Sequence, residues 1–184
     1  MKKENAVNKK FTKGFTLLEL LVVVLIIGIL AAIAIPQYKM VVGRSKFNTL
    51  KAMTQALASS AERFYLANDR YPTSYSELDV ELPGLTGGIQ RDSLFTIRSA
   101  QMNCTLNFDT KYVNCIKTIF GTEFIYQQFL NNADEENKNL RYCMLYNESS
   151  QGKLKKICQQ DVGDNSKKVV CNSSICIYYY NKNK

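Results

Sequence analysis

One carboxylate in an apolar run and six cysteines in the second half of the chain are the residues whose chemistry stands out. Residues 13–36 are almost continuously apolar, and Glu19 lies near the start of this run. A charged group in bilayer hydrocarbon costs about 2.5–3.5 kcal/mol on insertion scales, so Glu19 needs a partner or an environment other than lipid. We therefore expect a helix that does not remain in the membrane.

The apolar run is long enough to cross a bilayer once. Residues 15–35 form a stretch of 21 residues, which at about 1.5 Å per residue gives a helix of roughly 31 Å, close to the thickness of the hydrocarbon core. Five lysines and one glutamate precede it. Clustered lysines beside an apolar span stay on the cytoplasmic side of a membrane. The N-terminus is therefore predicted inside, and the residues after Pro36 outside.

The residues around position 14 follow a recognisable order. A basic leader ends in Gly14, Phe15-Thr16-Leu17-Leu18-Glu19 follows, and the apolar helix is interrupted at Pro36. This order resembles the prepilin N-terminus of the type IV pilin family, which includes the pseudopilins of type II secretion. The resemblance implies cleavage between Gly14 and Phe15 by a membrane prepilin peptidase, and N-methylation of Phe15. It also implies that Glu19 pairs with the N-terminal amine of a neighbouring subunit, a buried pair that sets register more than it adds stability.

Three other interpretations of this segment compete with the pilin one. Ala32-Ile33-Ala34 offers a signal-peptidase site after an apolar run, and a plain membrane anchor would need the same hydrophobicity. Neither explains Glu19 or the residues that surround it. A buried core helix is disfavoured because so long a run has no polar face.

The cysteines indicate disulfide bonds in an exported domain. Six cysteines allow 15 connectivities, and we favour sequential pairing. Cys104 and Cys115 flank two short alternating runs joined by a turn at residues 109–111, which predicts a hairpin with the sulfurs facing each other. Cys171 and Cys176 flank another short stretch, which leaves Cys143 with Cys158. A zinc site is the alternative, but the chain has no histidine and no Cys-x-x-Cys pair.

The helix is predicted to continue beyond Pro36 with a kink there, because proline removes one helical hydrogen bond. Residues at three- and four-residue steps then form one apolar stripe: Phe47, Leu50, Thr54, Leu57, Ala61 and Phe64. Tyr71-Pro72 ends the helix. Ser74 and Glu77 have the spacing of a capping box for a short helix. Strands are predicted at residues 94–98, 104–108, 111–116 and 122–127, with a final edge strand at residues 177–180 and no core element at residues 131–139.

The predicted fold class is α+β, and the resemblance implies the type IV pilin fold: a long N-terminal helix on a small antiparallel sheet, with a disulfide-stapled C-terminal region. The expected parts are a leader at 1–14, a filament-core helix at 15–36 and an amphipathic helix at 37–70. A connecting loop at 71–93 and the sheet at 94–184 complete the chain.

No group in the sequence suggests catalysis or a cofactor. The chain lacks histidine, the commonest catalytic base, and removal of the leader lowers the net charge from +8 to +4. Residues 161–165 resemble the region where some pseudopilins bind calcium, but they do not fit an EF-hand loop, and we interpret them as a polar turn. DNA binding by Lys153, Lys155, Lys156, Lys167 and Lys168 with Tyr178, Tyr179 and Tyr180 is a weaker hypothesis than a solvated surface.

The sequence therefore predicts a structural subunit of a type IV pilus and not an enzyme. Its expected partners are copies of itself and other pilins, prepilin peptidase, an inner-membrane assembly platform, and the lipid bilayer before assembly. We expect a single-pass inner-membrane precursor and an extracellular filament. A pseudopilin or minor pilin is the alternative within the family, and an anchored surface binding module that does not polymerise is the alternative outside it.

Overall fold

The computed structural model describes residues 14–81, 84, 86–91, 93–99, 102–138, 140–146, 154–162, 169–171 and 175–179. The predicted leader before Gly14, several of the candidate DNA-binding lysines and most of the candidate calcium segment lie outside this part. The chain divides into two compact units, Met1–Lys39 and Met40–Lys184. The second unit holds the sheet and the hydrophobic core.

The long helix α1 (Leu17–Asn68) has 52 residues and continues through Pro36, as the sequence predicts. The kink at Pro36 stays a prediction. The helix ends where Asp69 adopts a left-handed backbone with φ of 53° and donates its N–H to the carbonyl of Tyr65 at 2.8 Å. A residue with a left-handed backbone commonly ends a helix. Arg70, Tyr71 and Pro72 follow Asp69 and lead the chain toward the sheet.

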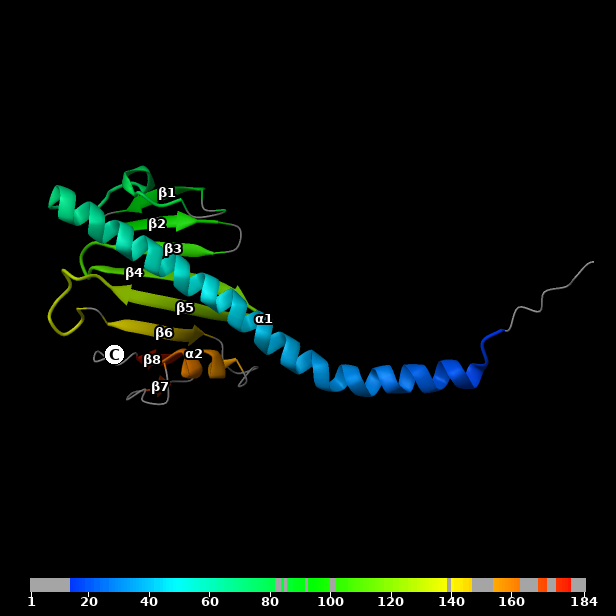
Figure 1. Ribbon diagram of the computed structural model, residues 1–184. Helices are drawn as coiled ribbons and strands as arrows, with labels where there is room; N and C mark the ends of the chain where they lie inside the picture. The colour runs from blue at the N-terminus through cyan, green and yellow to red at the C-terminus, as the bar shows by residue number, and fades with distance from the viewer. Residues whose placement is uncertain are drawn as a thin grey trace, which may run out of the picture. The chain divides into compact units, whose positions relative to one another are not determined.

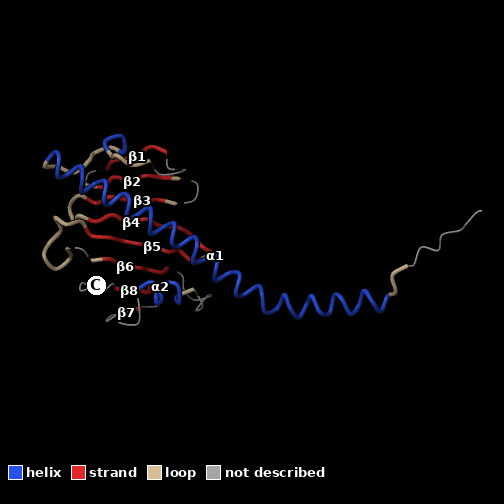
Figure 2. The backbone as a smooth tube through the Cα atoms, viewed as in Figure 1, coloured by secondary structure: helices blue, strands red, loops and turns tan. Residues whose placement is uncertain are grey.

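A single antiparallel sheet of eight strands forms the second layer, in the order β1-β2-β3-β4-β5-β6-β8-β7. The strands are β1 (Thr86–Arg91), β2 (Leu94–Arg98), β3 (Asn103–Asn107), β4 (Tyr112–Ile119), β5 (Thr122–Phe129), β6 (Arg141–Tyr146), β7 (Val169–Cys171) and β8 (Ile175–Tyr179). Figure 2 shows these strands in red, with α1 crossing part of the sheet and β8 and β7 beside the helix that spans Lys155–Val162. The fold class is α+β, as predicted.

The part of α1 from Met40 onward lies across one face of the sheet (Figure 1). Five members of the predicted stripe are buried, namely Phe47, Leu50, Thr54, Leu57 and Ala61. Phe64 is only half-buried. The ring of Phe47 contacts the rings of Phe124 and Tyr126 on β5, with centroids 5.8 and 6.1 Å apart. Alternate residues of the strands complete this core, because successive side chains point to opposite faces of a sheet.

A second helix, α2 (Lys155–Val162), packs against α1. A side-chain carbon at Gly43 would lie 3.0 Å from Cδ1 of Ile157, so glycine is what lets the two helices approach. The ammonium of Lys51 on α1 contacts the carboxylate of Asp161 on α2 at 2.8 Å, and both side chains are mostly shielded from water. Arg44 also donates a hydrogen bond to Gln160.

The connection between α1 and the sheet is held to the helix by ion pairs. Arg63 and Ser60 of α1 donate to the carboxylate of Asp79, and these hydrogen bonds, with Arg63 contributing most, hold the pKa of Asp79 below its ordinary value. The predicted short helix is η1 (Tyr75–Glu77), where Glu77 accepts hydrogen bonds from the backbone of Thr73 and Ser74. These contacts therefore fix the connecting segment against α1.

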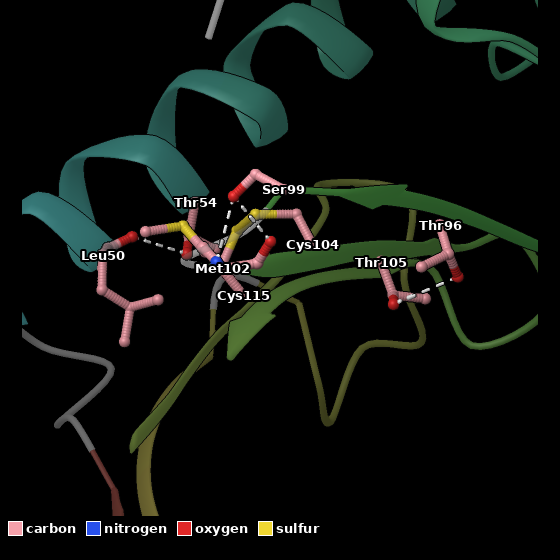
Figure 3. Close-up of a disulfide and its surroundings, with 8 residues drawn as sticks. All are labelled: Leu50, Thr54, Thr96, Ser99, Met102, Cys104, Thr105 and Cys115. Atoms are coloured by element: carbon pink, nitrogen blue, oxygen red, sulfur yellow. Dashed lines mark hydrogen bonds between the residues drawn. A yellow bond between two sulfur atoms is a disulfide. The ribbon is translucent and has the colours of Figure 1, made fainter. Parts of the chain in front are cut away.

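The three disulfides are Cys104–Cys115, Cys143–Cys158 and Cys171–Cys176, the sequential pairs that the sequence favours. Cys104 and Cys115 face each other across β3 and β4, and Figure 3 shows this disulfide below the part of α1 that carries Leu50 and Thr54. Cys171 and Cys176 are opposed in the same way across β7 and β8. Cys143–Cys158 differs, because it joins a strand, β6, to the helix α2.

The structure corrects several expectations about the sheet. β1 lies in the stretch predicted as a connecting loop, while β6, β7 and α2 have no counterpart among the predicted elements. β8 was expected at the sheet edge, but it lies between β6 and β7. β8 pairs with β6, about 30 residues earlier in the chain, and this long-range pairing leaves its other edge to β7. A local sequence pattern does not show such a pairing.

Candidate functional site

Three of the predicted site residues, Gly14, Phe15 and Glu19, lie at the start of α1. Gly14 and Phe15 lie just before the helix, and Thr16 occupies the position that caps it. Glu19 stands in the first turn. Its carboxylate accepts hydrogen bonds from the backbone nitrogen of Thr16 at 2.9 Å and from the Thr16 hydroxyl at 2.8 Å.

The same two residues also bond in the reverse direction. The backbone nitrogen of Glu19 donates to Oγ1 of Thr16 at 3.2 Å. Thr16 and Glu19 thus form a capping box, in which a hydroxyl and a carboxylate three residues apart satisfy the free N–H groups of a helix start. Sequence analysis gave no role to Thr16, although the Thr-x-x-Glu spacing before an apolar run was a readable signal.

Gly14 makes no demand on the fold. A side-chain carbon built at this position meets nothing within 4 Å. The packing of the described chain therefore does not explain a glycine here. A requirement for a small residue at position 14 would come from a molecule that acts on this peptide bond.

The apolar run that follows Glu19 is uncovered in the isolated chain. Every Phe, Leu, Val and Ile side chain from residue 15 to residue 35 is exposed, with Phe15 at 83% and Leu17 at 87%. Among the described residues, α1 is the one helix whose length and hydropathy suffice to cross a membrane. So large an exposed apolar surface marks a site of contact with lipid or with other protein.

The other predicted site residues belong to other parts of the chain. Pro36 is inside α1, and the six cysteines are all in the second unit. Within the described residues, no group of three or more His, Cys, Asp or Glu side chains is placed to hold a metal ion.

Comparison with known proteins gives the class of this N-terminus. The model of a family described as "Prokaryotic N-terminal methylation motif" matches residues 9–35. This match covers the residues directly before Gly14, the capping box of Thr16 and Glu19, and the exposed apolar run. The fold and this motif together define a pilin-like α+β protein.

Curated relatives narrow the class further. The chain is 46% identical over 66 residues to the type IV major pilin protein PilA of Myxococcus xanthus, covering 36% of this chain and 30% of that protein. It is 43% identical over 72 residues to a fimbrial protein of Pseudomonas aeruginosa (39% and 47%). It is 50% identical over 54 residues to the type IV major fimbrial protein FimA of Dichelobacter nodosus (29% and 35%). The chain is therefore type IV pilin-like.

The similarity to these relatives covers only part of each chain. The chain spans less than half of the length of each of these relatives. No solved structure matches the chain.

Proposed function

We propose that this chain is a structural subunit of a type IV pilus. In this proposal prepilin peptidase cleaves between Gly14 and Phe15 and N-methylates Phe15, and the assembly platform then moves the subunit from the inner membrane into an extracellular filament. The mature parts are the filament-core helix at 15–36, the amphipathic part of α1 that follows, the connection that leads to β1, and the disulfide-bonded region that begins with β1 at Thr86.

The observation that carries the proposal is the uncovered apolar surface of residues 15–35 directly after Glu19. Before assembly, lipid covers these side chains. In a filament, the same side chains of neighbouring subunits cover one another, and close helix packing replaces lipid contacts. An anchor that only held a head at the membrane would need the apolar run but not a carboxylate within it.

Glu19 has a different role in each state. In the isolated chain its charge is partnered by Thr16. In the proposed filament, cleavage after Gly14 creates an amine at Phe15, which would pair with Glu19 of a neighbouring copy. Two charges in an apolar core would then neutralise each other and fix the register between subunits.

The test is mass spectrometry of the N-terminal peptide from filaments sheared off cells that express the full chain, compared with the same peptide from their membranes. Abundant N-methylated peptide starting at Phe15 in the sheared fraction is the expected result. The same peptide confined to membranes would favour a pseudopilin, a minor pilin or an anchored module. A chain that starts at Ile35 would identify a signal peptide and overturn the proposal.

A further inference from the structure

Two surfaces of opposite charge lie at opposite ends of the sheet. The first is the acidic loop, which we define as Asp134, Glu135 and Glu136 between β5 and β6. The second is the basic hollow, where Lys46 of α1 and Lys117 of β4 line one concavity of about 550 Å³. We propose that the acidic loop of one copy of this chain docks into the basic hollow of the next copy along the filament. This inference rests on the proposed function and specifies the contact between the heads of neighbouring subunits, where the head is the second unit, Met40–Lys184.

The basic hollow is polar and open to solvent. Ser99 and Asn103 line it from β2–β3, while Thr118 and Glu123 line it from β4 and β5. The ammonium of Lys46 lies 5.2 Å from the centroid of the Phe120 ring, which holds this side chain over the sheet. Within the part of the chain that the structure describes, neither Lys46 nor Lys117 makes an ion pair. The lining of the hollow holds two cations, Lys46 and Lys117, and one carboxylate, Glu123. This excess of positive charge favours binding of an acidic segment.

The acidic loop is exposed and ordered. Asp134, Glu135 and Glu136 are all exposed, and the ammonium of Lys138 lies 3.8 Å from the carboxylate of Glu135. The backbone nitrogens of Asn137 and Lys138 both donate to the carbonyl of Asp134 at 2.8 Å.

The loop is also fixed to the core where it begins. The side chain of Leu130 is buried, and the backbone nitrogen of Asn131 donates to the carboxylate of Glu62 on α1 at 2.6 Å. A loop held in this way loses little freedom when it binds. Its three carboxylates are therefore presented to a partner at low entropic cost.

The position of the two surfaces decides which assembly they form. Glu123 near the start of β5 lines the hollow, whereas the acidic loop follows the end of β5, as the path of the chain in Figure 1 shows. Eight residues at about 3.3 Å each separate them by roughly 26 Å, so the loop cannot reach the hollow of its own head. A contact between two different patches is heterologous, and heterologous contacts build open helical assemblies instead of closed dimers.

Exposed ion pairs contribute little individually, so this contact orients heads more than it holds them together. Reversal of one charge replaces attraction by repulsion. We expect this reversal to lower the amount of sheared filament by about tenfold. A small loss of binding free energy between neighbouring subunits is enough for a tenfold change in the assembly equilibrium.

The first test uses the unaltered full chain. Cells are grown so that half of the subunits carry ¹⁵N, and sheared filaments are treated with a carbodiimide, which joins an amine to a carboxylate that touches it. Peptides that join Lys46 or Lys117 of one copy to the acidic loop of another, recognised by their mixed isotopes, are the expected product. Filaments without such peptides would overturn the docking and leave the proposed function intact. A wild-type chain that forms no filaments would overturn both.

The second test reverses the charges in pairs. Lys117→Glu and Glu136→Lys should each reduce the sheared filament, and the double variant should restore it. Lys156→Glu and Glu81→Lys are matched controls, because both residues are exposed and lie outside the two surfaces. The amount of processed chain in membranes shows that each variant folds. Single reversals that assemble as well as their controls, or a double variant that stays as poor as the single ones, would contradict the proposal.

Discussion

Thr16 and Glu19 satisfy each other's polar groups at the start of α1, through hydrogen bonds of 2.8 to 3.2 Å in both directions. Glu19 therefore has a partner in its own chain before any neighbour arrives. In the proposed filament, this carboxylate would exchange the cap of its own helix for the amine of a neighbouring copy. The capping role and the charge of Glu19 are then separable by mutation.

Glu19→Gln should keep the cap and remove the charge, because an amide oxygen accepts the same hydrogen bonds. We expect normal amounts of processed chain in membranes but little sheared filament. Glu19→Ala removes both features and should in addition destabilise the helix start by about 1 kcal/mol. Immunoblots of membrane and sheared fractions measure both effects. Normal filament yield from Glu19→Gln would show that the cap alone matters.

Thr16 provides the complementary experiment. Thr16→Val has a similar size but no hydroxyl, so it should weaken the cap by about 1 kcal/mol, whereas Thr16→Ser keeps the hydroxyl and is the control. We expect less processed chain in membranes for the valine variant than for the serine variant. Equal amounts would mean that the capping box has no part in biogenesis.

Gly14→Val should block cleavage without disturbing the fold, because no atom lies within 4 Å of the added side-chain carbon. The expected product is a full-length precursor that retains the leader and stays in the membrane. Its intact mass reports the cleavage, and its melting temperature in detergent should equal that of the uncleaved wild-type chain. Normal processing of this variant would show that the peptidase does not read Gly14.

The sequence predicts the helix better than the sheet. The apolar stripe from Phe47 to Ala61 repeats at the helical period and needs no knowledge of its partner, so its burial could be read directly. β1 was missed because Gly87 and Gly88 are typical of a joint and not of a strand. β7 was missed because three residues carry no pattern. Both strands lie at sheet edges, where pairing with one neighbour and not local preference decides the structure.

Gly43 tests the contact between α1 and α2. Gly43→Val should lower the free energy of unfolding by about 1–3 kcal/mol, because the new methyl groups would overlap the side chain of Ile157. In the background of Ile157→Ala the same change should cost less, since the obstructing atoms are gone. The wild type, the two single variants and the double variant form a double-mutant cycle. Chemical denaturation of each full chain in detergent measures its free energy of unfolding. Additive costs would show that the two side chains do not meet.

The disulfides should differ in importance. Replacing Cys143 and Cys158 by alanine frees a loop of 15 residues and should cost about 3 kcal/mol. The same change at Cys171 and Cys176, five residues apart, should cost less, because β7 and β8 remain paired through their backbones. Denaturation of the two double variants gives the comparison. A larger loss at Cys171 and Cys176 would contradict this ranking.

Acid should weaken the attachment of the connecting loop through Glu77. Hydrogen bonds from Arg70 above all, and from the backbone of Thr73, lower the pKa of Glu77 from 4.5 to about 2. Because the pKa is lower in the folded chain than in the unfolded one, the folded state binds fewer protons. This stabilisation is fully present above pH 4.5 and is lost as the pH falls toward about 2.

Glu77→Gln removes this titration, so its melting temperature should fall less steeply than that of the wild type between pH 5 and pH 2. Glu136→Gln is the control, because its carboxylate is exposed and makes no ion pair within the described residues. Arg70→Gln should flatten the profile as Glu77→Gln does, since the guanidinium contributes most to the lowered pKa. Parallel profiles for the wild type and Glu77→Gln would show that the contact with Arg70 does not form in solution.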